Sequence, residues 1–245
     1  MLINIFLLCY NEEVLLPHTI NHYKSHLPSA NIFIYDNYST DNSVNIAKEH
    51  GCKIAFWDSN NEINDYRYLK IKNNCWKIVK DGWVIVADMD EWLCVTEEDL
   101  IEEQKNNSCL LSIKGYDMIG ESKTESLTDI NLFDIKRAVN CPGESKSLCF
   151  YRPAICEMNY SPGAHRCRPI FFSNEYTCAK TFYSKKTYIN KHMNYLGLKY
   201  IIQKMIKRYE RSHKMRQNKL ATHYTNNIRE ISSRYFYLRK FSFEM

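Results

Sequence analysis

Continuous apolar runs alternate with amphipathic segments over the first hundred residues. Runs that are hydrophobic at every position indicate strands covered on both faces, and apolar residues three or four positions apart indicate helices. Four strand–helix units in a row predict an α/β fold with a mostly parallel sheet, which binds ligands at the carboxyl ends of its strands. The expected strands are 3–9, 31–35, 53–57 and 83–87, and the expected helices are 14–26, 41–50 and 64–80.

The pattern changes after residue 92. A short acidic helix is expected at 96–104, with Thr96 at its start, and a long helix with one apolar stripe at 196–219. Between them we expect a second, mixed sub-region of β-rich pieces at 110–114, 130–136, 148–151 and 176–183.

Charge separates the C-terminal segment from the rest of the chain. The 245 residues are 44% hydrophobic and 25% charged, which excludes disordered, collagen-like and coiled-coil classes. Residues 199–245 have a net charge of +9 and residues 1–198 one of −4, which together give the net charge of +5. The favoured interpretation of this segment is a solvated face on helices that pack on the body. Contact with an anionic glycan or a membrane surface is the alternative, and nucleic acid is disfavoured because no recognition motif accompanies the charge.

Cysteine and histidine spacing gives no metal or redox motif. The ten cysteines include no C-x-x-C pair, so we expect reduced thiols in a cytosolic protein. The apolar residues 1–9 have no basic flank or cleavage site and are too short to cross a membrane. His18, His22 and His26 are four residues apart, but Thr19 stands where H-E-x-x-H needs Glu, so we expect a polar helix face.

The most informative segment is the apolar run 83–87, which leads directly into Asp88, Asp90 and Glu91. Alternation along an extended chain would put Asp88 and Asp90 on one side. Two converging carboxylates suit Mn²⁺ or Mg²⁺ holding a diphosphate. The alternative is a strand followed by solvated turn acids, because D-x-D alone is a weak motif.

Three segments in order, 8–13 (LCYNEE), 34–43 (IYDNYSTDNS) and 87–92 (ADMDEW), resemble GT-A glycosyltransferases. Within that class the chain is similar to small bacterial or viral family 2-like enzymes with a D-x-D-E-aromatic signature. The resemblance implies a Rossmann-like GT-A domain at 1–195, with a nucleotide-binding half at 1–92 and an acceptor-side half at 93–195. Basic helices would follow at 196–245.

The resemblance also implies the ligands and the location. The donor would be a nucleotide-diphosphate sugar, with uridine favoured, and the acceptor a saccharide or glycoconjugate. Mn²⁺ or Mg²⁺ would be the cofactor. A cytoplasmic location, including a virus factory or the periphery of a membrane, is expected.

Site residues follow from the matched positions. Tyr10, Asn11 and Glu12 would contact the nucleoside. Asp36 would accept from the base N–H, or else cap a turn. Asp65 and Arg67 are expected at a helix start, where Arg67 would contact phosphate or form a salt bridge. Asp88, Asp90 and His165 would surround the metal, and His192 is the other candidate for binding metal or diphosphate. Lys146 would offset phosphate charge or be an ordinary surface lysine. Asp41 is expected to cap the helix at 41–50 rather than contact a ligand.

The implied reaction is displacement at the anomeric carbon by an acceptor hydroxyl. An inverting enzyme needs a carboxylate base, for which Asp117, Glu121, Glu144 and Glu157 are candidates. Inversion is favoured by the resemblance alone, and retention stays open. The rival functions are a nucleotidyltransferase, which would need a Gly-rich loop that residues 9–13 lack, and a basic module that binds anionic polymers.

Overall fold

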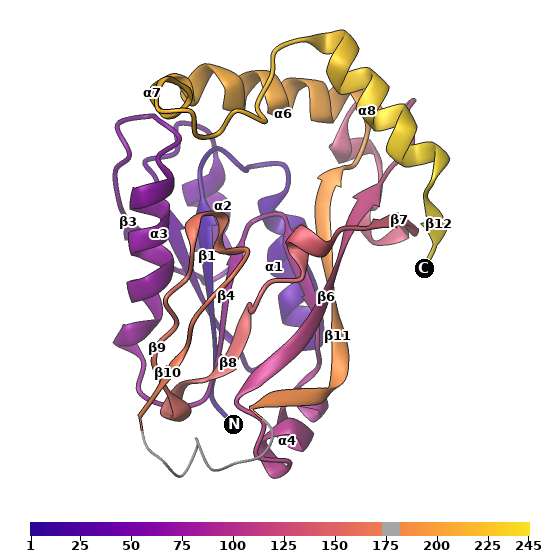
Figure 1. Cartoon of the computed structure of the whole chain (residues 1–245). Helices are drawn as coiled ribbons and strands as arrows, with labels where there is room; N and C mark the ends of the chain where they lie inside the picture. The colour runs from indigo at the N-terminus through magenta and orange to yellow at the C-terminus, as the bar shows by residue number, and fades with distance from the viewer. Residues whose placement is uncertain (173–181) are drawn as a thin grey trace.

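A computed structural model of the chain describes residues 1–172 and 182–245 and shows an α/β fold (Figure 1). The helices are α1 (Leu16–His26), α2 (Ser43–Glu49), α3 (Asp65–Asn74), α4 (Glu97–Lys105), α6 (Leu198–Arg211), α7 (His213–Gln217) and α8 (Ile228–Lys240). The strands are β1 (Ile3–Cys9), β2 (Asn31–Asp36), β3 (Lys53–Phe56), β4 (Trp83–Asp88), β5 (Glu91–Cys94), β6 (Leu110–Ile119), β7 (Arg137–Asn140), β8 (Cys149–Tyr151), β9 (Ile155–Glu157), β10 (Ile170–Phe171), β11 (Tyr183–Tyr195) and β12 (Phe243–Glu244).

The first half of the chain forms the parallel part of the sheet. Strands β3, β2, β1 and β4 lie side by side in that order, and each neighbouring pair is parallel. All four expected strands are confirmed to within one residue at an end. The third expected helix is shorter than predicted, since α3 ends at Asn74 and a 3₁₀ turn, Cys75–Ile78, follows it.

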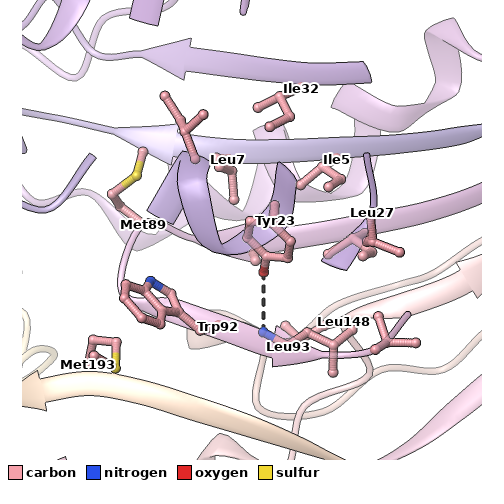
Figure 2. Packing of buried hydrophobic residues seen from close by; sticks show 14 of the residues in the cluster. Ile5, Leu7, Tyr23, Leu27, Ile32, Met89, Trp92, Leu93, Leu148 and Met193 are labelled. Atoms are coloured by element: carbon pink, nitrogen blue, oxygen red, sulfur yellow. Dashed lines mark hydrogen bonds between the residues drawn. The ribbon is translucent and has the colours of Figure 1, made fainter. Parts of the chain in front are cut away.

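Alternation along the buried strands assigns each face of the sheet to a different helix layer. Ile5 and Leu7 of β1 pack with Tyr23 and Leu27 of α1 (Figure 2). The alternate positions Phe6, Val84 and Val86 face a second cluster, which includes apolar residues of α3 and of the 3₁₀ turn after it. Asp88 is in step with Val84 and Val86, so it ends β4 on the α3 side of the sheet.

The second half of the chain extends the sheet with antiparallel pairs, as expected for a mixed sub-region. Strand β8 pairs antiparallel with β4 and β6, and β7 pairs antiparallel with β6. The long strand β11 lies between β5 and β6. The strand expected at 130–136 is wrong: the segment contains a 3₁₀ turn, Leu132–Asp134, because the Asn131 side chain accepts from Phe133 N and caps it. Of the piece expected at 176–183, residues 176–181 lie outside the described residues.

The C-terminal segment packs closely on the body. The helix expected at 196–219 is two helices, α6 and α7, and α8 packs on α6 through Ile201, Ile231 and Tyr235. Strand β12 pairs with β7, so the segment also adds an edge strand to the sheet. Helix α6 crosses the top of the molecule in Figure 1, above the carboxyl ends of the parallel strands. In the described part of the chain, no helix is long and apolar enough to span a bilayer.

The expected polar histidine face of α1 is wrong for His22. Its side chain is buried, and its ring stacks on Trp92 with centroids 5.0 Å apart. Its Nε2 lies 3.0 Å from the carbonyl oxygen of Leu93, and this contact makes Nε2 the proton-bearing nitrogen. Burial lowers the pKa of His22 to about 3.

Candidate functional site

Two adjoining cavities lie at the carboxyl edge of the parallel sheet, beneath α6. The smaller, about 180 Å³, is lined by Asp88 and Asp90 together with Tyr10 and Glu12 from the loop after β1. The larger, about 710 Å³, runs along α6 and shares Tyr10, Glu12, Arg208 and Arg211 with the first. The smaller cavity is called the carboxylate cleft below. It lies where ligands bind in open α/β sheets.

Asp88 ends β4 and pairs with a lysine of α3. Its Oδ2 lies 2.7 Å from Lys72 Nζ, and the lysine side chain is only 5% exposed. The backbone N–H of Asp88 donates to Glu91 Oε2 at 2.7 Å. Burial alone would raise the pKa of Asp88, but Lys72 lowers it. Asp88 therefore stays ionised in the cleft.

Asp90 sits in the two-residue turn between β4 and β5 and contacts three basic groups. Its Oδ2 lies 2.7 Å from Lys204 Nζ, 3.4 Å from His192 Nε2 and 3.5 Å from Arg208 Nη2. Burial would raise the pKa of this carboxyl, but Lys204 and His192 hold it well below its usual range. The charge of Asp90 is thus balanced by side chains of the chain itself.

The predicted metal ligands do not fit a divalent ion in this arrangement. A hard cation needs several free oxygen ligands, whereas Lys72 and Lys204 occupy one carboxylate oxygen each of Asp88 and Asp90. His165 is exposed and its Nδ1 lies 2.7 Å from the carbonyl oxygen of Gly143. Among residues 1–172 and 182–245 no group of three His, Cys, Asp or Glu side chains could hold a metal ion. The expected three-ligand site of Asp88, Asp90 and His165 is therefore not formed.

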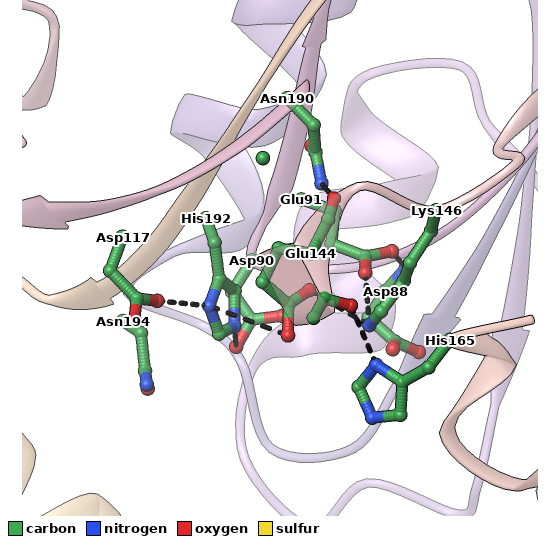
Figure 3. A network of polar contacts seen from close by, with 12 residues as sticks. Asp88, Asp90, Glu91, Asp117, Glu144, Lys146, His165, Asn190, His192 and Asn194 are labelled. Carbon is green, nitrogen blue, oxygen red and sulfur yellow. Dashed lines mark hydrogen bonds and ion pairs between the residues drawn. The ribbon is translucent and has the colours of Figure 1, made fainter. Parts of the chain in front are cut away.

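His192 lies on β11 at the register position of Asp117 on β6 and of Glu91 on β5. Its Nδ1 lies 2.6 Å from Asp117 Oδ1, and its Nε2 faces Asp90 (Figure 3). Burial would lower the pKa of His192, but Asp90 and Asp117 raise it to about 10. In this arrangement the imidazole is therefore protonated at neutral pH, and in that form both ring nitrogens are donors.

Glu91 and Lys146 form a buried pair behind the cleft. Glu91 is fully buried, and its Oε1 lies 2.6 Å from Lys146 Nζ. The same ammonium lies 2.9 Å from Glu144 Oε2 (Figure 3). Gly115 lets the Glu144 segment approach β6, because a Cβ there would lie 2.2 Å from the Glu144 carbonyl carbon. Lys146 is thus neither the expected phosphate contact nor a surface lysine, since both partners hold it inside the fold.

None of the four candidate bases lines either of the two cavities among the described residues. Asp117 and Glu144 are buried and paired with His192 and Lys146. Glu121 and Glu157 are paired near the surface, with Arg239 and Lys77 respectively. The sequence selected these residues by position after the D-x-D motif, and three of the four partners lie 75 or more residues away along the chain.

The loop after β1 contributes Tyr10, Asn11 and Glu12. Asn11 adopts a left-handed backbone (φ 53°) and its Oδ1 accepts from Thr40 N at 2.7 Å, which ties this loop to the loop after β2. Glu12 is half-buried between the two cavities, and burial raises its pKa to about 7. Its carboxyl is therefore close to half-ionised at neutral pH.

The remaining predicted residues have structural partners. Asp36 is buried and accepts from Ser39 N at 2.8 Å and Ser39 Oγ at 2.6 Å, the arrangement of the turn-capping alternative. Asp41 Oδ1 accepts from Ser43 N at 3.0 Å, beside the start of α2, but the N-cap residue of that helix is Asn42 and Asp41 also lines the larger cavity. Asp65 lines the carboxylate cleft, and burial raises its pKa. Arg67 donates to the carbonyl oxygen of Asp58 and does not line the cleft.

Four basic residues at the site were missed from the sequence: Lys72, Lys204, Arg208 and Arg211. The spacing of the last three, at i, i+4 and i+7, puts them on one face of α6. That spacing could have identified them, but the apolar stripe of the same helix dominated the prediction. Lys72 carries no comparable signal, since a single lysine on an amphipathic helix is usually solvated.

Residues 4–121 match the Glycosyl transferase family 2 model. The match covers just under half of the chain, and it includes the loop after β1, the Asp88–Asp90 turn and Lys72. A curated relative, Protein RfbJ of Shigella flexneri, is 37% identical over 46 residues, which are 19% of this chain and 36% of that protein. The match thus spans about a third of the relative's length.

Solved structures show distant likeness. S. aureus TarS 1–349 is 14% identical with a TM-score of 0.41, and the alignment covers 96% of this chain and 71% of that one. TarS 1–349 in complex with UDP is 16% identical with a TM-score of 0.40, covering 62% and 47%. A glucosyl-3-phosphoglycerate synthase of Mycobacterium tuberculosis, in complex with Mn²⁺, UDP and glucosyl-3-phosphoglycerate, is 14% identical with a TM-score of 0.34, covering 46% and 43%.

Proposed function

We propose that this chain is a glycosyltransferase that moves a sugar from a nucleotide-diphosphate donor, UDP-linked, to a hydroxyl of a saccharide or glycoconjugate. One observation carries the proposal: the family 2 match over residues 4–121 includes the loop and the turn whose side chains line the carboxylate cleft. A cleft at this edge of a parallel sheet is where a nucleotide binds in α/β folds.

The donor would lie with its nucleoside against the loop after β1 and its diphosphate toward α6. Tyr10 offers a ring face there, and Asp65 a half-buried carboxylate. The larger cavity, about 710 Å³, is spacious enough for a sugar and part of an acceptor. Asp36 would reach the base only if its two contacts with Ser39 were rearranged, so we keep it as a secondary candidate.

The reaction is a displacement at the anomeric carbon. The acceptor oxygen forms a bond to that carbon while the bond to the β-phosphate oxygen breaks, and the nucleoside diphosphate leaves with the electron pair. The acceptor's proton goes to a carboxylate. We infer that Glu12 takes it, because Glu12 lines both cavities and its pKa of about 7 suits a general base at neutral pH.

The proposal includes no metal-dependent step. The expected dependence on Mn²⁺ or Mg²⁺ rests on free carboxylate oxygens, and Asp88 and Asp90 hold lysines instead. A cytoplasmic location and an inverting outcome remain predictions from the family resemblance. A nucleotidyltransferase is disfavoured by the absence of glycine from residues 9–13. An anionic-polymer module is disfavoured because part of the basic charge of α6 faces the cleft.

The test is UDP release from a panel of UDP-hexoses and UDP-N-acetylhexosamines with simple saccharide acceptors, with GDP-sugars for comparison. We expect at least one UDP-sugar to be turned over, and Asp90→Asn to reduce turnover tenfold or more, because removing one charge of a buried ionic cluster leaves the others unbalanced. Asp134→Asn, on the exposed turn after β6, is the matched control. Failure of every nucleotide sugar to bind, or pyrophosphate release from a nucleoside triphosphate and a sugar phosphate, would contradict the proposal.

A further inference from the structure

The basic face of α6 points into the site. Lys204, Arg208 and Arg211 lie on one face of the helix, and all three line the larger cavity. The adjoining face of the helix is fixed by packing, since Ile201 is buried in the cluster that joins α6 to α8. Lys204 Nζ also donates to Asn194 Oδ1 at 2.8 Å, which fixes its position beside Asp90. The cations are therefore held in place before any ligand arrives.

Arg211 has hydrogen-bonding capacity that the protein does not use. Its guanidinium carbon lies 3.5 Å from the centroid of the Tyr10 ring, and its Nε donates to the carbonyl oxygen of Asn61 at 3.3 Å. Its Nη2 is buried and makes no hydrogen bond to any residue that the structure describes. A buried donor without an acceptor is costly. An anion bound in the adjoining cleft would supply the acceptor.

The charges in the cleft also leave the two arginines available. Asp88 is paired with Lys72 at 2.7 Å, and Asp90 with Lys204 at the same distance. Arg208 lies at the longer distance of 3.5 Å from Asp90, and Arg211 forms no ion pair with a carboxylate of the described residues. Two lysines thus neutralise the D-x-D carboxylates, and two guanidinium groups remain to face a ligand.

We propose that Arg208 and Arg211 bind the diphosphate of the donor directly, while Lys72 and Lys204 neutralise Asp88 and Asp90. The protein's own cations would then take the place in which the sequence predicts a divalent metal. This inference rests on the proposed function. Guanidinium groups bind phosphate oxygens through paired N–H donors. In the reaction they stabilise the charge that develops on the β-phosphate oxygen as its bond to the sugar breaks.

The test is isothermal titration of the full chain with UDP and with inorganic pyrophosphate, in EDTA and in Mn²⁺. We expect both to bind in EDTA. Arg208→Ala and Arg211→Ala should each weaken binding about ten- to a hundredfold, the loss expected for one charge-assisted pair. Arg211→Lys, which keeps the charge but loses the paired donors, should give a smaller loss. The matched control is Lys214→Ala on α7, an exposed lysine that is paired with Glu62 and lines neither cavity.

The outcomes separate this inference from the proposed function. Binding of UDP only with Mn²⁺, or wild-type affinity in both alanine variants, would overturn the arginine site and leave glycosyl transfer standing. Pyrophosphate binding in EDTA without turnover of any nucleotide sugar would support the arginine site and contradict the proposed function. Thermal melting of each variant checks that it is folded. If Arg211→Ala does not fold, Arg211→Lys serves in its place, because it keeps a cation against the Tyr10 ring.

Discussion

Lys146 Nζ and Glu91 Oε1 lie 2.6 Å apart in the interior of the fold, where neither side chain is more than 5% exposed. Glu91 also accepts from the backbone N–H of Asp88. The acidic run after β4 therefore has two parts: Asp88 and Asp90 line the cleft, whereas Glu91 points away from it and holds the turn in shape.

Breaking this pair should destabilise the protein strongly. Lys146→Met leaves Glu91 and Glu144 buried without their cation, so we expect the free energy of unfolding to fall by about 3–5 kcal/mol. Lys77→Met breaks the half-exposed pair with Glu157 and should cost less than about 1 kcal/mol. Urea denaturation of the two variants measures both effects. Equal losses would show that Lys146 is not a buried structural cation.

His22 should make the protein sensitive to mild acid. Its pKa is lowered to about 3 by burial, whereas an unfolded histidine has a pKa of about 6.5. Below pH 6.5 the His22 ring is therefore protonated in the unfolded chain but stays neutral in the folded chain. Above pH 6.5 His22 does not change the free energy of unfolding with pH. Below it, the free energy of unfolding falls by about 1.4 kcal/mol for each pH unit until the pKa of the folded state is reached.

The measurement is the free energy of unfolding at pH 7 and pH 5 for the wild type and His22→Gln. The variant has no titrating ring, so its loss between the two values should be smaller by about 2 kcal/mol. His213→Gln changes an exposed histidine and should keep the wild-type loss. If His22→Gln shows the same acid dependence as the wild type, His22 is not buried in its neutral form.

The sequence alone predicted the features that depend on local patterns of apolar residues, namely the buried strands and the residues at their ends. Strand Ile3–Cys9 is apolar at every position except Asn4, and strand Trp83–Asp88 at all but its last, so packing against both helix layers could be predicted from the sequence. The cleft position of Asp88 and Asp90 followed from the end of that strand. The charge partners did not follow, because Lys204 is 114 residues from Asp90, and Lys146 is 55 residues from Glu91.

Strand β11 shows the same limit in another form. It carries Lys, Asn and His at alternate positions, which reads as a solvated segment, but Asn190 is fully buried and donates to the Glu144 carbonyl at 3.1 Å. The Glu144 carbonyl meets only the amide N–H side of Asn190, since Asn190 Oδ1 has no hydrogen-bond partner among the described residues. Only the tertiary structure supplies that partner, so the role of the strand in holding His192 was not evident from the sequence.

Glu12 should control the pH dependence of the proposed reaction. As a general base it must be ionised, and burial raises its pKa to about 7, although Lys204 opposes this rise. The value of kcat/KM should therefore increase with pH through about 7 and then level off. Glu12→Gln should reduce kcat by about 10²–10⁴-fold, the range typical of a lost general base.

The control is Glu49→Gln, the same change at an exposed position on α2 that lines neither cavity, which should keep the wild-type pH profile. If Glu12 only helped to bind the donor, Glu12→Gln would raise KM, because ground-state and transition-state binding would be lost equally. The variant would then keep the wild-type kcat and the rise of kcat/KM near pH 7. If Glu12→Gln keeps the wild-type kcat, the proton goes to another carboxylate lining the cavities. Asp65 would be the next to examine, since it lines the cleft and its pKa is raised by burial as well.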